Sequence, residues 1–297
     1  MTIDAHHHLW RYDPSQHTWI SDRMRVLRRD FLPVDLKAEI GAVGVAGTIA
    51  VQAGHSLAES RFLLEQARKT DFVLAVVGWL PLAGPGLGAA LDGLAGDARL
   101  RGCRHVLQDE ADDDYMLRED FNQGLSRVTS AGLVYDILIY ERHLPQALVL
   151  VDRHPSQVFV LDHIGKPCIR EGSFRPWSGL IRKLARRPNV YCKLSGMVTE
   201  ADWNTWTYKQ MLPYLETVLD AFGTRRVMFG SDWPMCLLAS SYGRWFSAVE
   251  RFVSRLGDSE RLRVMGGTAA EAYGIRLPPG TMAIPADRPC PSSSTTA

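Results

Sequence analysis

The sequence has few cysteines, no long apolar run and almost no net charge, and each absence excludes a class of protein. Its five cysteines are scattered and lack CxxC spacing, which argues against a disulfide framework or structural zinc and predicts a reducing, cytoplasmic location. No apolar run could span a bilayer, and no basic segment precedes an apolar one near the N-terminus, so we expect no membrane anchor or secretory signal. A formal net charge of +1 does not indicate a nucleic-acid partner, and the composition leaves a homo-oligomer open.

The chain of 297 residues instead contains eight apolar segments separated mostly by helical patterns. Near-continuous apolar strands alternating with helices are typical of a parallel sheet covered by helices, and eight such units predict a distorted (β/α)8 barrel in a single domain over residues 1–275. An open doubly wound sheet is the alternative, but the glycine fingerprint expected after its first strand is missing. Residues 276–297 are rich in Pro, Ser and Thr and are predicted to be a disordered tail. The expected strands lie at 3–10, 45–53, 72–79, 100–107, 133–140, 158–165, 190–196 and 226–234.

The first expected strand carries an unusual run of polar side chains. Side chains alternate between the two faces of a strand, so Asp4, His6 and His8 are predicted to share one face. Three polar groups are costly in a plain core, which favours a face that opens onto a metal ion or a polar substrate. A lone histidine is more often a structural group, and the run also resembles part of a tag. The strand-like residues on both sides favour a functional role for His6 and His8.

Polar residues also close most of the other expected strands. The chemistry of a barrel of this type lies at the carboxyl ends of its strands, where these side chains would converge on one mouth. Each alone is explained at least as well by a helix cap or a turn, and only the joint pattern indicates a site. The residues are His6, His8, Gln52, Arg104, His105, His163, Lys193, Ser195 and Asp232.

Two chemistries fit such a mouth. His6, His8, His163 and Asp232 are nitrogen and oxygen ligands suited to one divalent transition metal, which would acidify a bound water and polarise a carbonyl. Without a metal, His, Arg and Lys side chains would polarise the carbonyl and Asp232 would be the general base for water. Both readings predict hydrolysis at a carbonyl carbon.

The motifs taken together resemble the amidohydrolase superfamily, in its amidohydrolase-2 branch. Within it, the sequence is similar to sugar lactonases of the L-fuconolactonase and L-rhamnonolactonase type, over nearly everything but the tail. The resemblance implies a barrel that hydrolyses a lactone ring, with Asp232 as the base that activates water and His6, His8 and His163 lining the catalytic centre. The matching motifs are Asp4-Ala-His6-x-His8-x-Trp10, Val51-Gln52-Ala53, Val77-Gly78-Trp79, Arg101-Gly102-x-Arg104-His105, Leu161-Asp-His163-x-Gly165-Lys166-Pro167, Cys192-Lys193-Leu-Ser195-Gly196 and Phe229-Gly230-Ser-Asp232-Trp233-Pro234.

The same resemblance implies a set of substrate-binding residues. Arg104, Lys193 and Trp233 are expected to contact the lactone carbonyl or the sugar hydroxyls, and Gln52 to read hydroxyls. Trp79 is expected to pack on the apolar face of the ring, as are Trp10, Trp19 and Trp233. Core packing explains each tryptophan equally well.

The sequence departs from the superfamily members that bind two metals. Those members bridge the metals with a lysine or glutamate on the fourth or fifth strand. The fourth strand here has no lysine, and the fifth has Asp136 but no histidine. We therefore expect no required cofactor, or at most one weakly bound Zn²⁺.

L-Fucono-1,5-lactone or a related aldonolactone is the predicted substrate class, and carbohydrate catabolism the predicted context. A dicarboxylic or aromatic-derived lactone, or a decarboxylation, is the alternative on the same barrel. It would require further cations, which the four arginines between Asp22 and Arg29 could supply unless they form a solvated basic face. A sugar-binding barrel without activity would require a degraded site, whereas His6, His8 and Asp232 are all present.

Overall fold

A computed structural model describes residues 1–94 and 96–277, and it confirms the predicted barrel. Eight parallel strands pair in sequence order from β1 to β8. The ring is closed where β1 meets the segment after β8, because His7 bridges Trp233 and the Asp232 amide donates to the His6 carbonyl at 2.8 Å. The strands are β1 (Thr2–His7), β2 (Val45–Val51), β3 (Val73–Gly78), β4 (Leu100–Val106), β5 (Val134–Leu138), β6 (Phe159–Leu161), β7 (Val190–Leu194) and β8 (Val227–Phe229).

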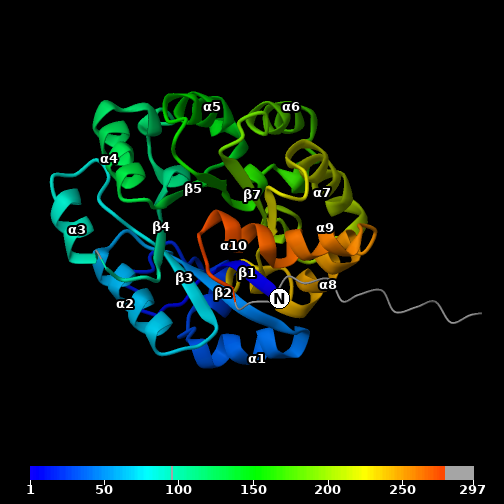
Figure 1. The fold of residues 1–297 in the computed structure, drawn as a ribbon. Helices are drawn as coiled ribbons and strands as arrows, with labels where there is room; N and C mark the ends of the chain where they lie inside the picture. Colours follow the sequence, from blue (N-terminus) through cyan, green and yellow to red (C-terminus); the bar gives the residue numbers. More distant parts are fainter. Residues whose placement is uncertain (95, 278–297) are drawn as a thin grey trace, which may run out of the picture.

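Helices surround the barrel, as Figure 1 shows. Several begin at side-chain caps that the sequence supplies: the Ser56 hydroxyl accepts from the Glu59 amide before α2, and Thr207 does the same for Gln210 before α7. None of the helices in the described ranges has both the length and the apolar character needed to cross a membrane. The helices are α1 (Pro33–Val43), α2 (Leu57–Arg68), α3 (Leu87–Leu94), α4 (Glu119–Ser130), α5 (Leu144–Arg153), α6 (Arg175–Leu184), α7 (Tyr208–Phe222), α8 (Tyr242–Val253), α9 (Asp258–Leu262) and α10 (Thr268–Ala272).

The apolar residues form two separate clusters. The larger cluster lies between the strands and the surrounding helices. The smaller one includes Ile3, Ile49 and Val160 of the strands together with Tyr273, which follows α10. Figure 1 shows α10 across one end of the barrel, beside the start of β1, so the last helix closes the end opposite the strands' carboxyl termini. The polar residues at the carboxyl ends are therefore left to form the open mouth.

The expected alternation along the first strand is wrong for one residue. The register of β1 against β2 shifts between Asp4 and His7, so one extra residue is inserted there. Such a bulge puts two consecutive side chains on nearly the same side of a strand. Asp4 consequently faces the helical layer, where the Tyr242 hydroxyl of α8 donates to its carboxylate at 3.0 Å, while His6 points into the barrel.

All eight strands end earlier than their apolar patterns predicted, and β6 and β8 differ most, by four and five residues. After β6, residues 162–166 form a tight turn, and His163, Ile164 and Lys166 all have positive φ. After β8, Asp232 also has a positive φ of 58°. Backbone groups that leave the ladder in this way re-aim their side chains, so the polar residues at these strand ends belong to loops over the mouth.

The long connection after the first strand is irregular, as expected, except for a short 3-10 segment at Asp22–Leu27. The predicted tail at 276–297 lies outside the described residues apart from its first two positions, as does Cys290. The other four cysteines are free thiols.

Candidate active site

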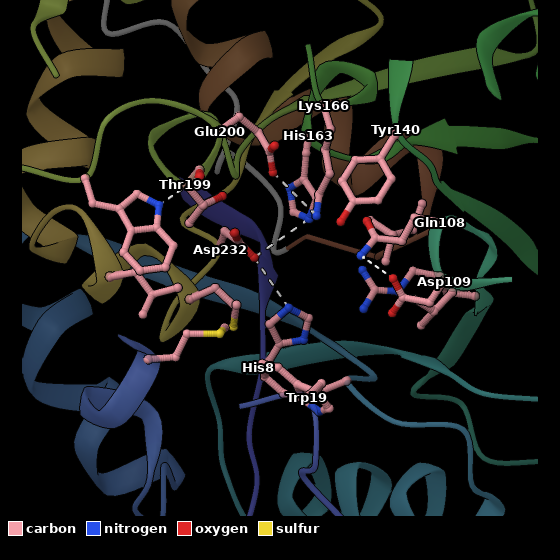
Figure 2. Close-up of a pocket in the computed structure, with 18 residues that line it drawn as sticks. His8, Trp19, Gln108, Asp109, Tyr140, His163, Lys166, Thr199, Glu200 and Asp232 are labelled. Carbon is pink, nitrogen blue, oxygen red and sulfur yellow. Dashed lines mark hydrogen bonds and ion pairs between the residues drawn. The ribbon is translucent and has the colours of Figure 1, made fainter. Parts of the chain in front are cut away.

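The main cavity of interest lies at the carboxyl ends of the strands and has a volume of about 430 Å³. Its walls combine acidic, basic, aromatic and aliphatic side chains from most of the strand-to-helix loops (Figure 2). The lining residues are His8, Trp19, Met24, Ala53, Arg104, Val106, Gln108, Asp109, Leu138, Tyr140, His163, Lys166, Thr199, Glu200, Trp203, Asp232, Met235 and Leu238.

Four of the predicted catalytic residues converge at the floor of this cavity, and we call them the catalytic cluster: His6, His8, His163 and Asp232. The Oδ1 atom of Asp232 lies 3.4 Å from Nε2 of His8, 3.7 Å from Nε2 of His6 and 3.8 Å from Nε2 of His163. Figure 2 shows Asp232 between His8 and His163. All four side chains are at least nine-tenths buried. The sequence motifs that contributed them are about 150 and 70 residues apart, so only the barrel brings them together.

Each imidazole is held through its other ring nitrogen. His8 Nδ1 lies 2.8 Å from the Val51 carbonyl, which can only accept, so this nitrogen carries a proton. His163 Nδ1 lies 2.9 Å from the Ser195 hydroxyl, and His6 Nδ1 lies 3.2 Å from Asp162 Oδ1. Contacts of this kind hold the orientation of each ring and direct the Nε2 atoms at Asp232, and the Val51 carbonyl also fixes the proton on His8 Nδ1.

Two motif glycines make room for these rings. A Cβ at Gly196 would lie 2.3 Å from His163 Nδ1, and a Cβ at Gly230 would lie 2.8 Å from the His6 Cβ. Real Cβ atoms do not approach so closely, and Gly196 also has a φ of 60°. The glycines that follow Ser195 and Phe229 are therefore explained by the packing of the catalytic cluster.

Burial and charge set the protonation of the catalytic cluster. Burial lowers the pKa of His163 to about 4 and that of His6 well below its usual range, so both rings are neutral at pH 7. Burial would raise the pKa of Asp232, but His163, His8 and Lys166 together outweigh it and lower that pKa. Asp232 is accordingly an ionised carboxylate beside the neutral His6 and His163 rings.

The catalytic cluster fits a single divalent metal ion. Asp232 Oδ1 is buried and accepts no hydrogen bond from the described residues, although a carboxylate oxygen normally requires a donor. His8 Nε2 lies 3.4 Å from this oxygen, so a proton on that nitrogen or a shared cation would stabilise the contact. Ligand atoms of one tetrahedral zinc are about 3.3 Å apart for bonds of about 2.0 Å. His6, His8 and Asp232 match this spacing, and Asp162 with His6 and His163 forms a second group of potential ligands.

Directly next to the catalytic cluster lies a fully buried network that we call the ion-pair layer: Arg104, Asp136, Asp162, Lys193 and Tyr273. The Lys193 ammonium lies 2.5 Å from Asp136 and 2.9 Å from Asp162. Arg104 lies 2.9 Å from Asp162, and the Tyr273 hydroxyl donates to Asp136 at 2.8 Å. Lys193 Nζ also lies 3.2 Å from His6 Nδ1. The layer therefore connects the floor of the active site to the helix that closes the other end of the barrel.

The structure distributes the expected substrate-binding residues over three locations. Arg104 lines the cavity, while the Gln52 side chain donates to the Arg104 carbonyl at 3.1 Å. Lys193 is fully buried in the ion-pair layer. Trp233 packs edge-on against Phe31, and Trp79 stacks on His55. Of these five residues, only Arg104 is among the cavity-lining side chains of the described chain.

The cavity also contains polar side chains that the sequence reading did not single out. Lys166, Glu200 and Tyr140 lie along one wall, and Gln108 and Asp109 along another (Figure 2). Lys166 belongs to the motif at residues 161–167, but the sequence did not predict a role for it. Its position in the same motif as His163 was the available signal. Glu200 and Gln108 stand in loops without a comparable pattern, so no signal in one sequence would have found them.

Comparisons with known proteins match the chain over nearly its whole length. The family model described as Amidohydrolase matches residues 3–275. The chain is 43% identical to an L-fucono-1,5-lactonase of Burkholderia multivorans over 94% of its length and 97% of that protein, and 38% identical to one from Burkholderia ambifaria over the same shares.

A crystal structure of an amidohydrolase from Burkholderia multivorans with bound zinc is also similar. It has a TM-score of 0.90 and 43% identity, over 93% of this chain and all of that one. These matches confirm the resemblance read from the motifs. Since the family model covers almost the whole described barrel, the chain belongs to the amidohydrolase family.

Proposed function

We propose that this protein hydrolyses the ester bond of a neutral sugar lactone, with L-fucono-1,5-lactone or a related aldonolactone as substrate. The observation that carries the proposal is the buried Asp232 carboxylate, whose Oδ1 faces the cavity floor without a hydrogen-bond donor among the described residues. A carboxylate held ionised in this way can accept a proton from water. The high similarity to two L-fucono-1,5-lactonases over nearly full length supports the substrate class.

Asp232 and Arg104 have different roles in the proposed reaction. Asp232 takes a proton from a water molecule as that water attacks the lactone carbonyl carbon. The Arg104 guanidinium, at the cavity floor, stabilises the negative charge that develops on the carbonyl oxygen. The bond to the ring oxygen then breaks, and the proton held by Asp232 passes to that leaving oxygen, which regenerates the carboxylate. The product is the open-chain aldonic acid.

His6, His8, His163 and Asp232 would hold a single weakly bound divalent ion such as Zn²⁺. Such an ion, when bound, polarises a carbonyl and lowers the pKa of a coordinated water. The neutral imidazoles have their lone pairs available for this purpose at pH 7. Gln52 acts through Arg104, whose carbonyl and guanidinium it contacts, and Lys193 acts through His6.

The charges of the cavity favour a neutral substrate over a dicarboxylic lactone. Each of the two lining cations other than histidine has a carboxylate partner: Arg104 has Asp162 and Lys166 has Glu200. Asp109 adds a negative charge to the wall. The arginine-rich segment contributes only Met24 to the lining, while Arg28 pairs with Asp22 and Arg29 with Asp35. A second substrate carboxylate would find no unpaired lysine or arginine among the described lining residues.

The test is hydrolysis of a panel of aldonolactones by chelator-treated protein, followed with a pH indicator and repeated after addition of Zn²⁺. We expect L-fucono-1,5-lactone or a close stereoisomer to be opened well above its spontaneous rate. Asp232→Asn protein provides the baseline. If no sugar lactone is opened faster than in the baseline, with or without Zn²⁺, the proposal is wrong.

A reducing cytoplasm remains the proposed location. The four described cysteines are free, and three of them are buried in the core. Burial raises the pKa of Cys103 and Cys236 well above the usual range, which keeps these thiols protonated and unreactive.

A further inference from the structure

One wall of the cavity carries an ion pair that the proposed reaction does not use. Lys166 Nζ lies 3.6 Å from Glu200 Oε1, and both side chains are largely buried, with exposed fractions of 14% and 19%. The separation is longer than a direct hydrogen bond. Within the described ranges, neither side chain makes a shorter polar contact, so the ammonium and the carboxylate both have unused hydrogen-bonding capacity directed into the cavity (Figure 2).

The backbone is strained in order to place Lys166 there. His163, Ile164 and Lys166 have φ of 54°, 53° and 45°, and Gly165 between them has 74°. Residues other than glycine rarely adopt this left-handed conformation, because it brings their Cβ too close to the following carbonyl oxygen. One turn of left-handed backbone carries residues three apart to the same side, so it presents both His163 and Lys166 to the cavity. Strain that the surroundings enforce in this way is typical of functional positions.

Neighbouring residues hold Lys166 and Glu200 in place but do not supply hydrogen-bond partners for their charged groups. The Lys166 ammonium lies 5.3 Å from the centre of the Tyr140 ring, which restrains it through a cation–π contact. Glu200 ends the short 3-10 segment Val198–Glu200, whose first residue is buried in the core. Because the two charges cancel, the pair has no preference for an ionic ligand. Its free donor and acceptor groups instead match neutral hydroxyls, each of which can accept from an ammonium and donate to a carboxylate at once.

We propose that Lys166 and Glu200 form the hydroxyl-reading pair of this enzyme and determine which configuration of the lactone ring hydroxyls is accepted. The inference rests on the proposed lactonase function and adds to it the residues that set specificity. A hydroxyl, or two neighbouring hydroxyls, bridges the gap between the ammonium and the carboxylate. A substrate that lacks them leaves two buried charges without a hydrogen-bond partner, which is the arrangement that rejects analogues most strongly.

The experiment compares Glu200→Gln and Lys166→Met with the unaltered enzyme on two substrates, L-fucono-1,5-lactone and δ-valerolactone, which has the same ring without hydroxyls. For each variant we expect kcat/KM on the sugar lactone to fall by about 10- to 100-fold, mostly through KM. The value on δ-valerolactone is expected to stay within about threefold, because that ring never contacts the pair. Glu216→Gln, which removes a partner from the exposed Arg255–Glu216 pair, is the matched control and should change neither value.

The outcomes separate this inference from the proposed function. If the unaltered enzyme opens no sugar lactone, the lactonase function fails first. If it does, an equal loss of kcat/KM on both substrates would show that Lys166 and Glu200 act in the chemistry or in folding. An unchanged kcat/KM on both substrates would show that they do not recognise the sugar hydroxyls. Either result overturns the hydroxyl-reading pair. Melting temperatures within a few degrees of the unaltered protein show that the variants are folded.

Discussion

The catalytic cluster and the ion-pair layer are neighbouring groups of buried polar side chains with opposite designs. In the ion-pair layer, every charge has an opposite charge within 2.9 Å. In the catalytic cluster, the Asp232 oxygen has only imidazole nitrogens near it, at 3.4–3.8 Å, and it forms no ion pair with a lysine or arginine of the described residues. Both regions are about equally buried. The difference in pairing therefore distinguishes side chains that can react from side chains that hold them.

His6 contacts both regions, and its contacts show how the ion-pair layer can hold a side chain of the catalytic cluster in position. Its Nδ1 contacts Asp162 and Lys193 of the ion-pair layer, while its Nε2 lies 3.4 Å from the Arg104 guanidinium and 3.7 Å from Asp232. A network in which buried charges are satisfied is rigid, because any movement exposes an uncompensated charge. The ion-pair layer thus fixes the position of one catalytic imidazole from behind.

The strongest test of this comparison is Asp232→Asn. Asparagine has the same shape and tolerates positive φ, so we expect the fold to be kept, with a change in unfolding free energy below about 1 kcal/mol. An amide cannot accept a proton from water, so kcat should fall by about 10³-fold or more. Stopped assays of L-fucono-1,5-lactone hydrolysis together with thermal unfolding measure both. An activity that survives within tenfold would remove Asp232 from the role of base.

Lys193→Met, in contrast, is expected to lower the stability of the protein. It leaves Asp136 and Asp162 buried without their shared cation, and breaking such a pair costs about 3–5 kcal/mol of stability. The measurement is chemical unfolding. The double variant Lys193→Met with Asp136→Asn removes one of the stranded charges and should recover part of the loss. A Lys193→Met protein as stable as the unaltered one would show that the layer does not hold the barrel together.

Tyr273→Phe tests the far end of the ion-pair layer with a smaller change. The Tyr273 hydroxyl donates to both oxygens of Asp136, at 2.8 and 2.9 Å, and a hydrogen bond to a charged group contributes about 1.5–3 kcal/mol. We expect a loss of stability of that size and a kcat within about threefold of normal. A large loss of kcat without a loss of stability would contradict the separation of the two regions.

The smallest effect is expected from mild acid. The pKa of Asp232 is lowered below 3.8 and that of His163 to about 4, so neither group changes protonation between pH 7 and about pH 5. Because the pKa of Asp232 is lowered, its carboxylate stays ionised and able to accept a proton until the pH falls through that lowered pKa. We therefore expect kcat to vary by less than about twofold over this range. KM is expected to rise toward pH 5, because burial raises the pKa of Glu200 and its protonation removes the negative charge of the hydroxyl-reading pair. A steep decline centred near pH 6 would show that a group with an ordinary histidine pKa controls the reaction.

Four residues that the sequence predicted for the active site lie close together in the structure. His6, His8, His163 and Asp232 were identified because polar residues followed apolar strands, and parallel strands bring their carboxyl ends together. Asp4 was placed on the wrong face because a bulge in β1 interrupts the alternation, and one extra residue leaves no mark on an apolar pattern. The expected positions of Lys193, Trp79 and Trp233 as substrate contacts stay predictions, although the cavity lining of the described chain does not include them.

The sequence by itself determined the barrel and its family, and it predicted a chemical type for the catalytic residues, because these depend on local periodicity and on motifs a few residues long. Only the tertiary structure decided which polar residues face each other. Lys166 and Glu200 are 34 positions apart, and Tyr273 and Asp136 are 137 apart. Their contacts depend on strand order, on a left-handed turn and on a bulge, and each of these is fixed by packing across the whole barrel rather than by the residues next to it in the chain.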